Sequence, residues 1–125
     1  MDKNIEILKK QEDLLQFPHF NHSTAYELGT FMVSCAQKQN ITIAISIRMN
    51  NGCIAFQYCP DGTNLLNQKW MERKFNTVSM MERSSLLSAL TFEQDHDTLE
   101  NHGLSATDYA LCGGGFPIRI KETAW

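Results

Sequence analysis

Residues 41–59 read ITIAISIRMNNGCIAFQYC, and this stretch decides the fold. Over residues 41–49, isoleucines and a methionine alternate with small or polar residues, which is the period-two pattern of a strand with one buried face. Residues 53–59 form a second alternating run. Between the runs, Asn51-Gly52 is the pair that a two-residue type I′ turn favours, because both central residues of that turn need a positive φ. The stretch therefore predicts an antiparallel β-hairpin.

The hydrophobic pattern also predicts the register of this hairpin. A two-residue loop brings apolar residues of the two runs opposite one another on one face. The predicted pairs are Met49 with Ile54, Ile47 with Phe56, and Ile45 with Tyr58. Turn chemistry and apolar pattern thus select the same buried face.

Helical periodicity precedes and follows the hairpin. Thr24 and Glu27 have the spacing of a capping box, and the apolar residues behind them recur at helical spacing, which predicts a helix over residues 24–39. Residues 66–81 repeat this spacing, and a third helix is expected to begin near Ser84-Ser85.

Two further elements lie toward the ends of the chain. Apolar residues within residues 5–15 suggest a short helix, packed as an appendage or used in assembly. After Gly113-Gly114-Gly115, alternation over residues 116–120 predicts a third strand, and Pro117 means either that this strand lies at a sheet edge or that the proline stands at its start. This order of elements predicts an α+β fold in which helices pack on one face of a small antiparallel sheet. We expect that either a C-terminal piece is missing from the sequence or an oligomer completes the sheet.

Composition limits the class of protein. The chain has 125 residues, of which 42% are hydrophobic, and a formal net charge of −3. This length predicts a single domain over residues 1–125. The basic residues form no long run, which argues against nucleic acid as a partner. No apolar stretch reaches the roughly 20 residues of a membrane helix or resembles a signal peptide, so we expect no membrane segment and a cytoplasmic location.

The cysteines and histidines show no motif spacing. The four cysteines lack Cys-x-x-Cys and the four histidines lack His-x-x-x-His, so the sequence assigns no metal ligands and no cofactor. A Cys112–His102 pair is an imaginable nucleophile and base, since such catalysis needs only proximity in space. The sequence assigns no catalytic residue, and whether the chain is an enzyme stays open.

Lys74 is out of place in its predicted helix. It lies four residues from both Trp70 and Val78, which puts an ammonium on or beside the apolar stripe. In one interpretation its methylene stem covers Trp70 while the charge reaches water. In the other, Lys74 and Arg73 bind an anionic group, and the planar guanidinium pairs with a carboxylate.

The serine pair and the triple glycine also allow two interpretations each. The serines can cap a helix, or they can present hydroxyl and N–H groups to an anion. The glycines can serve close packing alone, or their successive N–H groups can cradle an oxyanion. No Gly-Lys-Ser/Thr follows them, so this is not a Walker loop. The candidate ligand-binding residues are therefore Arg73, Lys74, Ser84, Ser85, Gly113, Gly114 and Gly115.

Two motifs together are specific to one family. Trp70-Met71-Glu72-Arg73-Lys74 is followed downstream by Gly113-Gly114-Gly115-Phe116-Pro117-Ile118. Other matching segments, in the same order, are Leu15 to Phe20, Ala25 to Gly29, Ser84-Ser85 and His102-Gly103-Leu104. Over residues 11–121 the chain resembles the GlcG/HbpS-like branch of the haem-degrading domain family.

This resemblance implies a profilin-like α+β fold and a homo-oligomer. Some proteins of the family bind haem, so it implies haem or another small anionic molecule as ligand, and it transfers no catalytic residues. The branch often has His before the glycines, where this chain has Cys112. Since the branch continues past the Pro-Ile strand into further strands and a C-terminal helix, we expect the chain to be C-terminally truncated.

Three functional hypotheses follow. The leading one is a cytoplasmic, self-assembling domain that binds a small anionic ligand, such as haem, near Arg73, Lys74 and the glycines. The second is an oligomeric scaffold or protein-interaction module. The third is a haem-degrading enzyme.

Overall fold

The computed structural model describes residues 3–121, and these divide into two compact units. The hairpin unit is His19–Lys69. The helical unit combines Met1–Pro18 with Trp70–Trp125, of which residues 3–18 and 70–121 are described. The chain combines helices with a small antiparallel sheet, which is the predicted α+β class.

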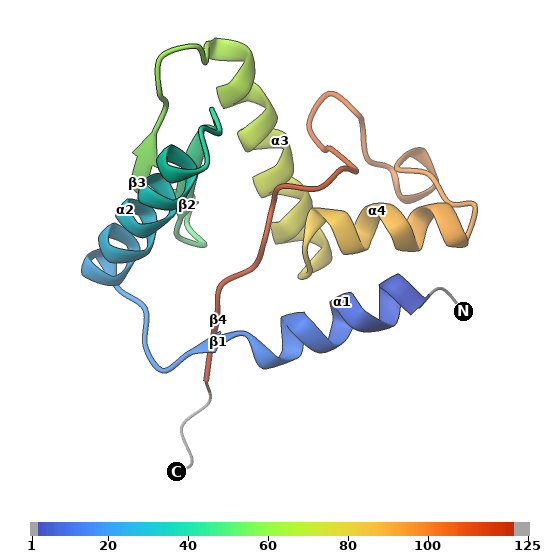
Figure 1. Cartoon of the computed structure of the whole chain (residues 1–125). Coiled ribbons are helices and arrows are strands. Elements are labelled where there is room, and N and C mark those ends of the chain that lie inside the picture. Colours follow the sequence, from blue (N-terminus) through green and yellow to red (C-terminus); the bar gives the residue numbers. More distant parts are fainter. Residues whose placement is uncertain (1–2, 122–125) are drawn as a thin grey trace. The chain divides into compact units, whose positions relative to one another are not determined.

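In the hairpin unit, one helix covers one face of the two-stranded sheet. The elements are α2 (His22–Lys38), β2 (Ile45–Arg48) and β3 (Ile54–Tyr58), as Figure 1 shows. Ile45 and Ile47 are buried on the sheet. The helix approaches closely at Gly29, where a Cβ atom would overlap the ring of Phe56. A glycine inside the helix is therefore explained by the aromatic ring that it admits.

The helix begins earlier than the sequence pattern predicted. Asn21, not Thr24, is the N-cap, and its Oδ1 accepts a hydrogen bond from Thr24 N at 2.9 Å. Thr24 Oγ1 in turn accepts one from Asn21 N at 3.3 Å. The capping box is real but lies one turn before the predicted one, because Asn is as good an N-cap as Thr.

The predicted register is correct along most of the hairpin and wrong at its turn. Ile47 pairs with Phe56 and Ile45 with Tyr58, as predicted. Ile54, however, pairs with Arg48 instead of Met49, because the register shifts after Ile47.

The turn chemistry explains this shift. Asn51 is not among the described residues with positive φ, whereas Gly52 has φ 90°. Met49 N donates to Cys53 O at 2.8 Å, so the loop has three residues, and its last residue is the left-handed glycine. The longer loop moves the cross-strand pair nearest the turn by one residue. Ala55 is then an extra residue between the paired Ile54 and Phe56, and this bulge restores the predicted register farther from the turn.

The helical unit is organised by two short strands and several helices. Its elements are α1 (Lys3–Leu14), β1 (Gln16–Phe17), most of α3 (Leu65–Met81), α4 (Ser85–Gln94), the 3₁₀ helix η1 (Glu100–His102) and β4 (Arg119–Ile120). β4 pairs in parallel with β1, and Lys121 N donates to Phe17 O at 2.7 Å. The expected third strand is therefore shorter than residues 116–120. Within residues 3–121 it pairs with β1 and not with the hairpin.

A buried carboxylate joins α1 to α4, which Figure 1 shows in blue and orange. Glu12 is only 2% exposed. Its Oε1 accepts from Ser84 N at 2.8 Å and its Oε2 accepts from Ser84 Oγ at 2.7 Å. Ser84 is the N-cap of α4, and its Oγ also accepts from Leu87 N at 3.0 Å. The negative charge thus lies at the helix end where the backbone dipole favours it.

The loop after α4 is closed by Asp97. Its Oδ2 lies 2.6 Å from His102 Nε2, and its Oδ1 accepts from Asn101 Nδ2 at 2.9 Å and Thr98 N at 2.8 Å. The His102 bond, followed by those from Asn101 and Thr98, lowers the pKa of Asp97 from 3.8 to about 2. η1 then ends at Gly103, whose φ of 73° is the left-handed conformation common just after a helix.

Asp97 is expected to make stability acid-sensitive in a defined window. Because its folded-state pKa is depressed, its contribution is complete above the unfolded pKa of 3.8 and is lost as pH falls toward 2. Urea unfolding of the wild type and of Asp97→Asn should therefore differ in midpoint at pH 6, with the wild type more stable. The two midpoints should converge as the pH approaches 2. A difference that stays constant down to that pH would contradict the assignment.

Candidate functional site

The described side chains of α3 hold the segment before the triple glycine. Asn76 Nδ2 donates to Asp108 O at 2.9 Å, and Arg73 Nη2 donates to Tyr109 O at 3.3 Å. These contacts fix the backbone of the incoming segment, drawn in red beside α3 in Figure 1.

Thr77 makes the central contact of this attachment. It is 0% exposed, its Oγ1 accepts from Ala110 N at 3.0 Å, and the same hydroxyl lies 2.9 Å from Ala110 O. Ala110 is itself buried. One hydroxyl therefore satisfies both backbone groups of a buried residue, which would otherwise be costly to bury.

The N-terminus of α4 holds the other end of the glycine turn. Ser85 N donates to Gly115 O at 3.0 Å, and Ser85 Oγ accepts from Gly115 N at 2.8 Å. Ser85 is fully buried. The turn at residues 113–115 is thus fixed between Thr77 upstream and Ser85 downstream.

Lys74 lies against this turn. A Cβ atom at Gly114 would be 2.7 Å from Lys74 Nζ and 3.1 Å from its Cδ, so a larger residue there would displace the end of the lysine side chain. Gly114 also has φ 129°, a conformation that L-residues rarely adopt. Gly114 therefore allows the backbone conformation of the turn, and its lack of a side chain leaves space for the Lys74 ammonium.

Arg73 stacks on the indole of Trp70. Its guanidinium carbon lies 4.3 Å from the ring centroid, and Lys74 Nζ lies 5.8 Å from the same centroid. Both cations are half-buried, and both gain from the negative face of one ring. Arg73 Nε is buried and has no hydrogen-bond partner within the described residues.

The positive charges of Arg73 and Lys74 have no acidic partner among the described residues. Within residues 3–121, neither Arg73 nor Lys74 forms an ion pair with a carboxylate. The N–H groups of Gly113 and Gly114 likewise donate no hydrogen bond to a described residue. Arg73, Lys74 and the turn thus present several donors and net positive charge, which is what an anion requires.

The two serines play different parts from these cations. Ser84 binds an anion, but that anion is the Glu12 carboxylate of α1, and Ser84 caps α4 at the same time. Ser85 uses its hydroxyl on Gly115. Of the two interpretations from the sequence, capping describes Ser84, and Ser85 supports the glycine turn.

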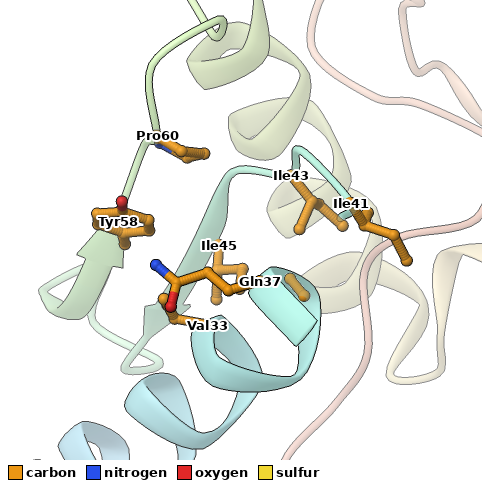
Figure 2. Close-up of a pocket in the computed structure, with 8 residues that line it drawn as sticks. Val33, Gln37, Ile41, Ile43, Ile45, Tyr58 and Pro60 are labelled. Carbon is orange, nitrogen blue, oxygen red and sulfur yellow. The ribbon is translucent and has the colours of Figure 1, made fainter. Parts of the chain in front are cut away.

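A small apolar pocket lies in the hairpin unit, between the end of α2 and the strands (Figure 2). Its volume is about 40 Å³. Its lining residues are Val33, Ala36, Gln37, Ile41, Ile43, Ile45, Tyr58 and Pro60. Ligand pockets usually measure roughly 300–1,000 Å³. This one holds no charged residue and is too small for haem.

Other chemical groups are dispersed or occupied. Among residues 3–121, no three His, Cys, Asp or Glu side chains gather as they would around a metal ion. Cys112 is a free, half-buried thiol, and no contact joins it to His102, whose Nε2 is held by Asp97. The imagined Cys112–His102 pair therefore gains no support. Within the described part of the chain, no helix combines the length and apolarity that membrane crossing demands.

Sequence reasoning missed three groups that build this site. Thr77 looked like a polar residue on a helix, and the Tyr109 carbonyl leaves no trace in a side-chain pattern. Glu12 looked like one charged residue among many in α1. No sequence pattern marks these groups, because their partners are backbone atoms or residues far away in the chain.

The glycines provide a matched pair of substitutions. A Cβ atom at Gly115 would lie 2.8 Å from Val78 Cγ2 and 3.1 Å from Lys74 O, whereas at Gly113 the nearest atom is 3.6 Å away, on Leu86. Gly115→Ala should lower the free energy of unfolding by about 2 kcal/mol, the usual cost of overpacking. Gly113→Ala should change it by less than about 0.5 kcal/mol. Urea unfolding of both variants tests this, and equal effects would refute the packing described here.

The chain is similar in sequence to known proteins. A family model described as "Haem degrading protein HbpS-like" matches residues 20–124. A UPF0303 protein of Yersinia enterocolitica is 37% identical over 123 residues, which cover 98% of this chain and 73% of that protein. A UPF0303 protein of Serratia proteamaculans is 40% identical over 121 residues, covering 96% of this chain and 74% of the relative.

The fold has a close counterpart among solved structures. The crystal structure of Ybr137w protein superimposes with a TM-score of 0.86 at 23% identity, over the whole of this chain and 73% of that one. This likeness confirms the predicted fold class. With the family model and the curated relatives, it confirms the resemblance drawn from the Trp70 and triple-glycine motifs: the chain belongs to the HbpS-like family of haem-degrading proteins, in its UPF0303 branch.

Proposed function

We propose that this chain is a self-assembling cytoplasmic domain that binds a small anionic ligand at Arg73, Lys74 and the turn of Gly113–Gly115. The observation that carries the proposal is the Lys74 ammonium, which lies against Gly114 without an acidic partner among the described residues. Folding leaves few half-buried cations uncompensated unless a ligand or solvent balances them. Ser84 and Ser85 support the site and do not touch the ligand.

Haem is a candidate ligand because the family description names it. The site fits the acidic edge of haem, since two neighbouring cations without an acidic partner among the described residues suit propionate carboxylates. Cys112 precedes the glycine turn directly and is a free thiol, the type of group that can ligate iron. Haem would supply redox chemistry when bound, and the residues present assign no reaction to this chain.

Hemin titration tests the ligand. The wild type should shift the Soret band, and Lys74→Gln should weaken binding about tenfold, because one charge-assisted contact contributes about 1.5–3 kcal/mol. Lys69→Gln is the matched control, since it removes a charge from an exposed position of the same helix. If the two variants Lys74→Gln and Lys69→Gln bind hemin with equal affinity, haem does not bind at this site.

Self-assembly is supported by exposed apolar residues around β4. Phe116, Ile118 and Ile120 alternate along this segment, and each is exposed. Within the described residues β4 has β1 as its neighbour on one edge and none on the other. An apolar strand with a free edge is a surface that natural proteins cover. We propose that a second copy covers it. The same observation favours the scaffold as the alternative function.

Sedimentation velocity tests the assembly. The wild type should sediment as an oligomer, and Ile118→Lys should shift the distribution toward monomer because it buries a charge in an apolar contact. Leu66→Lys, at an exposed apolar position in the hairpin unit, serves as the control and should leave the oligomer intact. A wild-type chain that stays monomeric and folded at high concentration would exclude self-assembly.

A further inference from the structure

The site carries two positive charges that no described carboxylate pairs with. Arg73 contributes one positive charge and Lys74 another, and both lie near one indole ring. A single carboxylate on the ligand would leave one of them unbalanced. A group that carries two negative charges matches the pair.

The groups available for a ligand are donors. The Tyr109 carbonyl accepts from Arg73, and the Ser85 hydroxyl is engaged with Gly115. The groups left to contact a ligand are the Lys74 ammonium, the remaining N–H groups of the Arg73 guanidinium, and the backbone N–H groups of Gly113 and Gly114. A ligand group that only accepts hydrogen bonds fits this set, and a group that must also donate does not.

The arrangement of these donors favours a compact, tetrahedral anion. A lysine acts as a point charge without a preferred plane, and N–H groups of a glycine turn can surround several oxygens of one centre. Because Lys74 is held against Gly114, ammonium and turn address the same small volume. A planar carboxylate binds a guanidinium best through two parallel hydrogen bonds. In Arg73 the Nε atom is buried and Nη2 donates to the Tyr109 carbonyl, so this two-point contact is less accessible to a carboxylate.

Trp70 offers a surface for the rest of the ligand. It is 39% exposed, although the Arg73 guanidinium lies over its ring, so the part of the indole that Arg73 leaves uncovered is the surface in question. An exposed indole can stack on a flat ring.

We infer that the site takes the phosphate monoester of a small, ring-containing molecule in preference to a carboxylate. The inference rests on the proposed anion site and specifies its ligand class. The phosphate oxygens contact Lys74, Arg73 and the glycine turn, and the ring lies on Trp70. Binding is non-covalent and involves no transfer of the phosphoryl group.

Three ligands with one benzene ring separate the possibilities. Phenyl phosphate is a dianion at neutral pH, phthalate carries two carboxylates, and benzoate carries one. Binding is followed by the fluorescence of Trp70 in a full-length Trp125→Phe background, which leaves one tryptophan. Phenyl phosphate should bind at least tenfold tighter than either carboxylate. Its affinity should rise between pH 5 and 7.5, because phosphate monoesters lose their second proton near about pH 6.

Substitutions locate the ligand. Lys74→Gln should weaken phenyl phosphate at least tenfold, whereas Lys69→Gln should leave its affinity unchanged. Should Lys74→Gln fail to fold, the ligand series on the background protein still decides, since only a ligand beside Trp70 changes its emission. Equal or tighter binding of benzoate or phthalate would overturn the phosphate preference.

The outcomes also separate this inference from the proposed function. Hemin binding that depends on Lys74, without any response to phenyl phosphate, would overturn the inference and leave the anion site standing. If neither hemin nor the three small anions bind, both proposals fail. Phenyl phosphate binding that Lys74→Gln does not weaken would place the ligand elsewhere and overturn the inference.

Discussion

The helical unit depends on the hydroxyl of Thr77. Thr77 and Ala110 lie 33 residues apart in sequence, and the one side chain satisfies both backbone groups of the other residue in a dry environment. A buried peptide group without partners costs about 1–3 kcal/mol, so this contact decides where the segment from Asp108 to Ala110 can run. The glycine turn follows three residues later. Its position relative to α3, and with it the setting of Lys74, is a consequence of this hydroxyl.

The polar groups of the helical unit are of two kinds. Some are hydrogen-bonded to one another within the unit, and others are cations without an ion pair among the described residues. Glu12 and Ser84 satisfy one another and the first turn of α4, and Ser85 satisfies Gly115 at both backbone atoms. These groups are hydrogen-bonded within the unit and stabilise the fold. Arg73 and Lys74 form no ion pair with a described carboxylate, although each is half-buried. Ser88 Oγ and Arg119 Nε are also buried without a hydrogen-bond partner among the described residues, so an unpartnered polar atom alone does not locate the site. The placement of two half-buried cations beside the glycine turn is what favours binding there.

The sequence predicted correctly those features that depend on residues close together in the chain. The hairpin, its pairs Ile47–Phe56 and Ile45–Tyr58, and the helix cap at Ser84 all follow from spacing within a few residues. The turn was mispredicted because Asn-Gly suits both a two-residue loop and a longer loop with one left-handed glycine. Long-range contacts were beyond reach: nothing near Ser84 identifies Glu12, 72 residues away, as its partner. The same limit hid the pairing of β4 with β1. For the site, the sequence identified the unusual lysine and the glycines, and the contacts with Tyr109 and Ala110 needed coordinates.

Lys74 shows why the two interpretations drawn from the sequence do not exclude one another. Its ammonium lies within 5.8 Å of the Trp70 ring, so the stem does cover an aromatic surface. The same placement brings Nζ to Gly114, where a side chain would block it. Glycine at position 114 is required by its φ of 129° alone, and the absence of a side chain there also leaves room for the end of the lysine. The N–H groups of Gly113 and Gly114 donate to no described residue. An anion bound beside the ammonium would be attracted by that charge and could accept hydrogen bonds from the turn, whereas shielding of Trp70 uses only the methylene stem.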